Sequence, residues 1–337
     1  MISDPVHALP ADWRPLTADD LPALLSLVNA SDAADQERFP TTLDDLASQL
    51  LAPTVDLERS TVVIEDAMGA LVGWCGLEPR IGGEMWNRIH VHGSVHPAAR
   101  GRGHGRALLG WAERRSPTVF DAAEAARRAL PDVLTVHASE AATGRARLQD
   151  RSGYRLVRWY SDMFRSLAEP LPAASLLDGH RFLSWSRERD ADFHAADIEA
   201  FRDHWGSAPW TAEAWRHEYA DDPGFRPDLT VGVEREAEVV GYVMVASYEG
   251  IEDDEGRQVA WLARLGVRRG HRGRGIGTAA ITHALALARA AGFATAGLDV
   301  DTESLTGALR LYERLGFYPM KRLALRAKTI RQAGASA

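Results

Sequence analysis

A six-residue run rich in arginine and glycine occurs twice in this chain of 337 residues, at Arg100–Gly105 and at Arg272–Gly277. Each copy follows an extended apolar stretch and precedes a stretch whose apolar residues recur at helical spacing. Two apolar hairpins upstream also correspond, and downstream Ser152–Tyr154 matches Leu315–Phe317. One repeat at half the chain length predicts duplication of a whole domain rather than a solenoid.

The seam between the two copies should be polar and contain proline, and Ala168–Ser175 meets both requirements. We therefore predict an N-terminal domain over residues 1–168, a linker over 169–180 and a C-terminal domain over 181–330. The first copy is longer after its motif helix, which we interpret as an insertion at Ser116–Pro131.

The second copy is expected to alternate short strands with helices. The predicted strands are residues 229–234, 239–247, 259–267, 296–300 and a strand from Phe317, and the predicted helices are residues 191–204, 211–219, 275–291 and 304–315. Antiparallel hairpins interrupted by helices are typical of the α+β class. We predict two tandem α+β domains, each a mostly antiparallel mixed sheet flanked by helices.

Composition indicates which partners and which cellular compartment are expected for this protein. A net charge of -8 argues against a general nucleic-acid partner. The only cysteine, Cys75, cannot form an internal disulfide, fits a reducing compartment, and is expected to be a buried small residue of a strand. The first ten residues lack the features of a secretory signal, and no apolar run reaches the roughly 20 residues of a membrane span. We expect a cytoplasmic protein without a membrane partner.

The run Arg272–Gly277 leaves a strand and opens a helix. Glycines there let the backbone approach an anion, and the free N–H groups and dipole of the helix favour negative charge. Arg272 and Arg274 add charges suited to a pyrophosphate. A dinucleotide fingerprint, which needs alternating parallel strands, and a purely structural turn remain alternatives. An RNA-binding tail is excluded because the run is short and flanked by apolar segments.

Two motifs of the second copy, and their spacing, resemble the GNAT acetyltransferase superfamily. Leu265–Gly277 resembles its acyl-CoA motif, and Ala308–Phe317 resembles its Ala-x-x-Leu-Tyr-x-x-x-Gly-Phe motif. The tandem layout is similar to that of mycothiol-synthase-like actinobacterial proteins of the superfamily. The resemblance implies acetyl-CoA as co-substrate, without a metal, bound by Leu265, Gly266, Val267, Arg272, Gly273, Arg274, Gly275, Ile276, Gly277 and Thr278.

The resemblance also implies a mechanism in which an amine attacks the thioester directly. The tetrahedral oxyanion needs a preorganised donor, which the resemblance assigns to a backbone N–H near Leu265–Val267, in a strand that a bulge re-aims. Tyr312 matches the tyrosine that protonates the departing CoA thiolate in the family. A phenol titrates near 10 and a thiol near 8.5, so Tyr312 can act without a large pKa shift.

The general base is left open. The family often places a glutamate on the strand before the glycine loop, but no carboxylate lies there in this chain. Candidates by location are Glu249, Asp299, Asp301 and Glu303; solvated charges, a water relay or a partly neutral acceptor are the alternatives. Where the family frequently has an asparagine before the tyrosine helix, this chain has Ser304, which we expect to cap the helix and bind the cofactor.

The first copy keeps the glycine loop and loses the tyrosine. Its matching cofactor residues are Val95, Arg100, Gly101, Arg102, Gly103, His104, Gly105 and Arg106. Counting back from Gly153 as from Gly316 puts Gln149 at the position of Tyr312, and glutamine cannot protonate a thiolate. We predict that the first copy retains acyl-CoA-binding residues, is catalytically weak or inactive, and serves mainly as a scaffold.

Three histidines of the first copy, His90, His92 and His96, allow three interpretations. Strand alternation puts His90 and His92 on one face, which suits a metal site, but no carboxylate or cysteine follows at ligand spacing. A polar strand face lining the unused cleft is favoured, and a base for an active first copy is the third interpretation.

The sequence defines the acceptor of the acetyl group less well than the cofactor. Four aromatic residues of the expected helical hairpin, Trp205, Trp210, Trp215 and Tyr219, line an acceptor pocket or, as we favour, pack in the core. The acidic run Glu249–Glu255 is interpreted as a solvated turn. We expect a small-molecule primary amine as acceptor and a monomer or homodimer, with protein N-acetylation or a non-catalytic acyl-CoA-binding module as alternatives.

Overall fold

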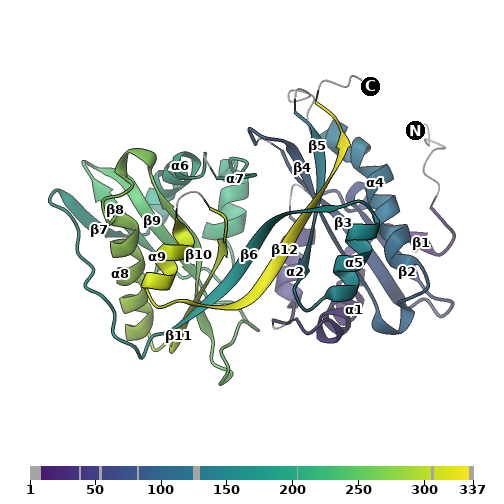
Figure 1. Ribbon diagram of the computed structural model, residues 1–337, viewed down its shortest axis with the longest axis horizontal. Coiled ribbons are helices and arrows are strands. Elements are labelled where there is room, and N and C mark those ends of the chain that lie inside the picture. The colour runs from purple at the N-terminus through teal and green to yellow at the C-terminus, as the bar shows by residue number, and fades with distance from the viewer. Residues whose placement is uncertain are drawn as a thin grey trace. The chain divides into compact units, whose positions relative to one another are not determined.

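The structure, a computed structural model, describes residues 9–37, 39–52, 55–81, 83–123, 130–202, 204–304 and 307–333. They form two compact units, each built from a sheet and helices (Figure 1). The first unit comprises the chain up to Val157 and again from Leu323, and the second comprises Arg158–Arg322. The units therefore do not divide at the linker expected over residues 169–180.

The first unit is a mixed sheet with helices on both faces. Its strands, in spatial order, are β1 (Trp13–Arg14), β2 (Thr61–Glu65), β3 (Leu71–Arg80), β4 (Asn87–Val95), β5 (Asp132–Ser139) and the later part of β12 (Tyr318–Arg331). Only β4 and β5 pair in parallel among these described strands. The helices are α1 (Leu21–Ala34), α2 (Leu43–Leu50), α3 (Leu57–Ser60), α4 (His104–Ala122) and α5 (Thr143–Arg151).

The second unit repeats this plan. Its strands, in spatial order, are the later part of β6 (Arg155–Ser166), β11 (Thr295–Asp301), β10 (Val259–Val267), β9 (Glu238–Ala246), β8 (Val231–Arg235) and β7 (His180–Ser184). Strands β10 and β11 form the parallel pair. The helices are α6 (Asp190–Ala200), α7 (Ala212–Trp215) with a π-helical turn over Arg216–Ala220, α8 (Ile276–Ala290) and α9 (Ala308–Arg314).

Each unit completes its sheet with a strand from the other half of the sequence. Strand β6 pairs antiparallel with β11, so that Asp162 lies opposite Asp299. Strand β12 pairs antiparallel with β5, so that Leu323 lies opposite Ser139. Because the two repeats supply equivalent last strands, exchanging them preserves the pairing in both sheets. This exchange is the reason that the compact units differ from the predicted domain boundaries.

Alternation along β9 explains the two apolar layers of the second unit. Val243 and Val245 belong to the core beneath α8 and α9, whereas Tyr242 and Met244 pack with α6 and α7. Full burial of such a side chain stabilises the fold by about 1.5–3 kcal/mol. The helical spacing predicted for α8 is confirmed, since its apolar residues are buried in the first of these cores.

Several predicted boundaries shift. Helix α6 ends at Ala200 rather than His204, and α9 begins at Ala308 rather than Ser304; Leu305, expected in that helix, lies outside the described residues. Helix α4 continues through Pro117, so the start of the expected insertion is helical, while residues 124–129 lie outside the described part of the chain.

The interpretation of Cys75 is confirmed. Its side chain is buried in the core of the first unit, and burial raises the pKa of the thiol, which makes it unreactive. Across the described residues, every helix is too short or too polar to cross a membrane.

Candidate active site

The centre of the second unit is an opening between two parallel strands. Strands β10 and β11 pair only from Val259 with Thr295 to Trp261 with Gly297, and the described strands part beyond that point. A register shift between Leu262 and Arg264 marks a β-bulge in β10. The bulge predicted near the oxyanion donor is therefore present, a few residues before Leu265–Val267.

The glycine loop after β10 has the geometry of an anion site. Gly273 and Gly275 have φ values of +71° and +78°, the left-handed region that favours glycine, and nothing lies within 4 Å of a Cβ at either position. Gly275 caps α8 without a side-chain hydrogen bond. The first N–H groups of α8, at Ile276, Gly277 and Thr278, consequently have no intrahelical acceptor and are available to an anion.

Two other predicted residues are fixed by packing. A Cβ on Gly266 would lie 2.6 Å from the Tyr242 ring and 2.9 Å from Ala200, so only glycine fits where α6 meets the end of β10. Ile276 is buried, and its side chain would lie 2.6 Å from a Cβ on Gly241. These close contacts set the position of the α8 N-terminus against the sheet.

The two arginines of the loop, both expected to serve a pyrophosphate, differ in their contacts with the rest of the protein. Arg272 Nε donates to the carbonyl of Val267 (3.1 Å) and Nη2 donates to the carbonyl of Ala200 (2.6 Å). Arg272 therefore ties the loop to β10 and α6. Arg274 is exposed and makes no hydrogen bond or ion pair with a residue that the structure describes, so its charge is available to a ligand.

Arg274→Ala is expected to weaken CoA binding about tenfold at low salt, the loss of one charge-assisted hydrogen bond of about 1.5 kcal/mol. The deficit should shrink as salt screens the wild-type interaction. Arg272→Ala should instead lower the melting temperature, because two backbone carbonyls lose their donor. Calorimetric CoA titrations and thermal melts of both variants check this; equal salt dependence in the two variants would contradict it.

Tyr312 lies in α9 and packs in the core next to Phe317, with ring centroids 6.0 Å apart. Burial, together with the negative charge of Asp299, raises the pKa of Tyr312 above its ordinary value. The expectation of an unshifted phenol is therefore corrected. The hydroxyl stays protonated at neutral pH, the form that a proton donor needs.

The carboxyl group of Asp299 lies on β11 just beyond the point where β10 and β11 part. The Asp299 side chain is accessible to solvent, although its carboxyl group is largely surrounded by protein atoms. Burial raises the pKa of Asp299, and the positive charge of Arg264 partly opposes that shift. Asp299 thus interacts electrostatically with both Arg264 on β10 and Tyr312 on α9.

A buried polar network holds Arg264 in place. Asp197 of α6 accepts a hydrogen bond from the Tyr242 hydroxyl (2.5 Å) and another from Arg264 Nε (2.7 Å). The Arg264 guanidinium also lies 3.3 Å from the centroid of the Phe201 ring. Because Asp197 is 1% exposed, the network fixes the charge of Arg264 at the opening.

The exchanged strand β6 brings a further cation to the second unit. Arg158 lies over the Trp205 ring, 4.5 Å from its centroid. Its guanidinium forms an ion pair with Glu303 (3.0 Å) and lies 3.8 Å from Asp301. Asp301 also accepts the backbone N–H of Glu303 (2.9 Å). Glu303 and Asp301 are therefore engaged in holding Arg158.

Ser304 does not cap the tyrosine helix. The N-cap of α9 is Gly307, whose φ of 72° is left-handed and whose N–H donates to the carbonyl of Ser304 (3.2 Å). Ser304 is thereby held one turn before the helix.

Most of the aromatic residues of the helical hairpin pack in the core, which is the interpretation that the sequence favoured. Trp215 and Tyr219 are buried and Trp210 packs against them, whereas Trp205 lies under Arg158.

The acidic run forms the turn between β9 and β10. There Asp253 is buried and binds Arg257 and Thr295. This part of the turn is therefore not solvated, contrary to the expectation.

Comparison with known proteins decides the family. Residues 190–317 match the acetyltransferase (GNAT) family. A mycothiol acetyltransferase of Thermobispora bispora is 33% identical over 224 residues, covering 66% of this chain and 70% of that protein. The chain belongs to the GNAT acetyltransferase superfamily. It is an N-acetyltransferase, and enzymes of this superfamily use acetyl-CoA, so the dinucleotide interpretation of the loop is excluded.

Further similarities extend over both repeats. A mycothiol acetyltransferase of Thermomonospora curvata is 29% identical over 298 residues, covering 88% of this chain and 90% of that protein. A GCN5-related N-acetyltransferase structure from Sphaerobacter thermophilus has a TM-score of 0.74 at 26% identity, covering 97% of this chain and 98% of the other. A tandem GNAT protein of the clavulanic acid pathway, at 20% identity with a TM-score of 0.67 over 96% of this chain and 99% of its own, shares the fold.

In this acetyltransferase the first unit keeps the backbone of the site. Gly101 and Gly103 have φ values of +78° and +92°, and Gly103 caps α4 without a side-chain hydrogen bond, leaving the N–H groups of His104 and Gly105 to an anion. Strands β4 and β5 pair from Asn87 to His90 and then part. Arg102 and Arg106 are exposed, and Val95 precedes the loop as Val267 does in the second unit.

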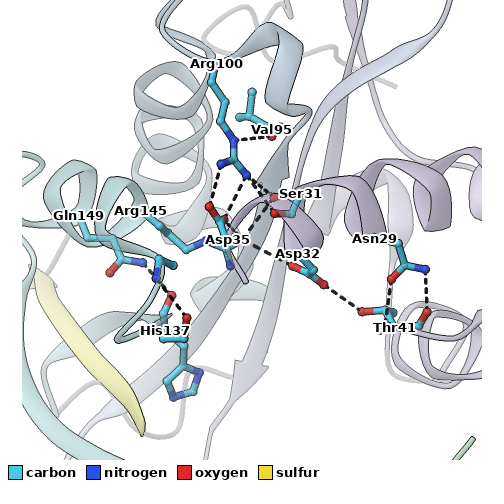
Figure 2. A network of polar contacts seen from close by, with 12 residues as sticks. Asn29, Ser31, Asp32, Asp35, Thr41, Val95, Arg100, His137, Arg145 and Gln149 are labelled. Carbon is cyan, nitrogen blue, oxygen red and sulfur yellow. Dashed lines mark hydrogen bonds and ion pairs between the residues drawn. The ribbon is translucent and has the colours of Figure 1, made fainter. Parts of the chain in front are cut away.

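An ion-pair network absent from the sequence interpretation ties this loop to its neighbours (Figure 2). Arg100 donates to the carbonyls of Val95 (3.2 Å) and Ser31 (3.2 Å), as Arg272 does to the equivalent carbonyls. In addition Asp35 lies 2.7 Å from Arg100 Nη1 and 3.2 Å from Arg145 Nη2. Arg100 therefore shares the carboxylate of Asp35 with Arg145, and its expected phosphate contact stays a prediction.

Gln149 occupies the position of Tyr312, as counted from the sequence. The residue five positions later, Tyr154, donates its N–H to the Gln149 carbonyl, as Phe317 does to the Tyr312 carbonyl. The buried Gln149 side chain donates to the carbonyl of His137 (2.8 Å).

The histidines of the first unit do not form one group. His90 and His92 line a cavity together with His137 of β5, and His96 is apart, accepting the N–H of Ala98 (3.3 Å). Within the described residues, no three His, Cys, Asp or Glu side chains have a geometry that could hold a metal ion. The favoured interpretation, a polar face lining the cleft, is confirmed for His90 and His92.

Three polar residues of the site could not be identified from the sequence, because their contacts form only in the folded chain. Asp197, Arg264 and Arg158 lie far apart in the chain, and none belongs to a motif. The one available signal was the charge of Arg264 inside an otherwise apolar strand.

Proposed function

We propose that the second unit transfers an acetyl group from acetyl-CoA to a primary amine of a small molecule. The observation that carries the proposal is the electrostatic interaction of Tyr312 with Asp299, which lies on β11 just beyond the point where β10 and β11 part. The names of the relatives support an acceptor of the mycothiol type. The carboxylate of Asp299 on β11 favours a cationic amine.

The proposed steps use groups of this chain. The N–H groups at the start of α8 and the Arg274 side chain bind the CoA phosphates. The amine attacks the thioester carbonyl, and a backbone N–H near Leu265–Val267 stabilises the oxyanion. The C–S bond breaks, and Tyr312 donates its proton to the CoA thiolate. Ser304 is proposed to bind the cofactor beside α9.

We assign the general base to Asp299. Among the four carboxylates considered, Glu249 lies in an exposed turn, while Asp301 and Glu303 bind Arg158. Asp299 is accessible, interacts electrostatically with the proton donor, and has a raised pKa that brings its basicity closer to that of an amine substrate.

Asp299→Asn is expected to lower kcat/KM for the amine by about 10²-fold. Because the carboxylate form is required, wild-type kcat/KM should fall as the pH drops through a pKa above the ordinary aspartate value of about 3.9. In the variant this dependence should be lost, leaving only the dependence set by the pKa of the amine itself. A pH profile checks it. Glu249→Gln, at the exposed turn, is the matched control; an identical acid limb in Asp299→Asn would contradict the assignment.

The acceptor class is tested by thiol release from acetyl-CoA with a panel of amino sugars, aminoglycosides, cysteinyl glycosides and peptides. A small-molecule amine should support turnover and peptides should not. Turnover with peptides alone would favour protein N-acetylation, and CoA binding without turnover would favour a non-catalytic module.

The proposal extends to the setting of the enzyme. The single buried thiol fits a reducing cytoplasm, and the net charge of -8 disfavours a nucleic-acid partner. We propose a monomer or homodimer that needs no metal.

A further inference from the structure

We propose that Arg158 determines which amines the second unit accepts. By neutralising Asp301 and Glu303, it leaves Asp299 as the carboxylate that faces the amine, so the site selects acceptors with one ammonium group over diamines and polyamines. The inference rests on the small-molecule acetylation proposed above, and it adds the charge class of the acceptor.

The side chains concerned lie on one face of the sheet. Strands β6 and β11 pair antiparallel, with Asp162 opposite Asp299 and Tyr160 opposite Asp301. Opposite residues of such a pair share a face, as do alternate residues of one strand. Arg158, two residues before Tyr160 on β6, therefore lies on the face that carries Asp301 and Asp299.

Arg158 is held in place by two other segments of the second unit. Its Nη1 donates to the Glu303 carboxylate (3.0 Å), and its Nε lies 3.8 Å from the Asp301 carboxylate. The guanidinium also covers the Trp205 ring, 4.5 Å from the centroid. Because the side chains of Arg158 and Asp301 are only 15% and 2% exposed, solvent screens this ion pair little.

The remaining charged groups leave Asp299 to the acceptor. Arg264 is bound to the buried Asp197 (2.7 Å). Asp162, the other carboxylate on the shared face, is buried and already interacts with another group. Asp299 is accessible and forms no ion pair with a residue of the described ranges. It is consequently the carboxylate that an ammonium group can approach.

The neighbouring His204 adds no charge at neutral pH. Its Nδ1 donates to the carbonyl of Trp205 (3.2 Å). Burial lowers the pKa of His204, and the positive charge of Arg264 lowers it further; the opposed effects of Asp301 and Arg158 are smaller. The imidazole is therefore neutral, and the charge balance is set by the carboxylates and Arg158.

A diamine would need a second carboxylate beside Asp299. Successive residues on one face of a strand are about 7 Å apart, so a ligand whose two nitrogens have that spacing could reach both Asp299 and Asp301. The guanidinium of Arg158 already occupies the position beside Asp301 and repels a second ammonium group. An acceptor with one ammonium group avoids this repulsion.

The first unit does not repeat this arrangement in the part of the chain that the structure describes. Strands β10 and β11 end their pairing at Gly297, and β4 and β5 end theirs at Thr135. Counting four residues onward from each, Ser139 corresponds to Asp301, so the carboxylate that pairs with Arg158 has no equivalent there. The charge selection therefore belongs to the unit that carries Tyr312.

The test is calorimetric titration of the CoA-saturated full chain, at low salt, with the diamine putrescine and with 4-aminobutanol. These probes have the same carbon chain and differ by one ammonium group. The wild-type protein should bind the amino alcohol at least as tightly as the diamine. Arg158→Gln, which removes the charge and keeps a polar side chain, should shift the ratio of the two dissociation constants toward the diamine by about tenfold or more.

Three further variants separate charge selection from a structural effect. Arg158→Lys keeps the charge and should keep the wild-type ratio. Glu303→Gln, at a side chain that is 50% exposed, should shift the ratio several-fold against the diamine, because Arg158 loses one of its carboxylates. Arg322→Gln is the matched control, since Arg322 lies over the Trp159 ring at the same 4.5 Å, and it should leave the ratio unchanged.

An unchanged ratio in Arg158→Gln overturns the proposal, and failure of both probes to bind that variant counts as unchanged. A wild-type preference for the diamine, or an equal shift in Arg322→Gln, also overturns it. Thermal melts establish that each variant is folded; should Arg158→Gln be unfolded, the direction of the shift in Glu303→Gln decides. Failure of the proposed acetylation is read separately, from amine-dependent thiol release by the wild-type protein.

Discussion

Tyr312→Phe is expected to lower kcat for amine acetylation by about 10²- to 10⁴-fold, the range that a positioned general acid contributes. Without the hydroxyl, the CoA thiolate must leave unprotonated, while the ring that packs beside Phe317 is retained. KM for acetyl-CoA should change little, because the phosphate-binding loop is untouched. Steady-state thiol release with the best acceptor of the panel measures both constants.

Tyr318→Phe is the matched control, since Tyr318 is 47% exposed and lies only a few residues further along the chain. Its kcat should equal that of the wild-type protein. A Tyr312→Phe variant that keeps more than a tenth of wild-type kcat would remove Tyr312 from the proposed mechanism. Should loss of activity instead accompany Arg100→Ala with Arg102→Ala, the catalytic copy would be the first one.

Asp197→Ala is expected to lower the free energy of unfolding by about 3–5 kcal/mol, the cost of removing one partner of a buried ion pair. The change strands the charge of Arg264 and removes the acceptor of the Tyr242 hydroxyl. Because Arg264 is fixed at the opening beside Asp299, amine acetylation should also fall. Denaturant unfolding measures the first effect and thiol release measures the second.

A second aspartate of α6 provides the comparison. Asp192 binds Arg189 at the surface with its side chain 47% exposed, and Asp192→Ala should cost no more than about 1 kcal/mol. If both substitutions lower the free energy of unfolding equally, the network around Asp197 contributes no more to stability than a surface ion pair does. Asp197→Asn, which keeps one acceptor oxygen, should fall between the two.

The duplication, the two glycine loops and the position of Tyr312 could be predicted from local sequence patterns. These are local properties: glycines at left-handed φ values, such as Gly275 and Gly316, and apolar residues at helical spacing can be identified without knowing what lies opposite. The same counting correctly placed Gln149 at the position equivalent to Tyr312.

The strand exchange and the electrostatics of the site depend on tertiary contacts. The exchange of β6 and β12 is invisible in the sequence because two equivalent last strands fit either sheet equally well. The engagement of Arg100 and Arg272 with backbone carbonyls, and the pKa shifts of Asp299 and Tyr312, arise from groups far apart in the chain that folding brings within a few ångströms. Charge and burial at a site depend on such neighbours, and no local pattern encodes them.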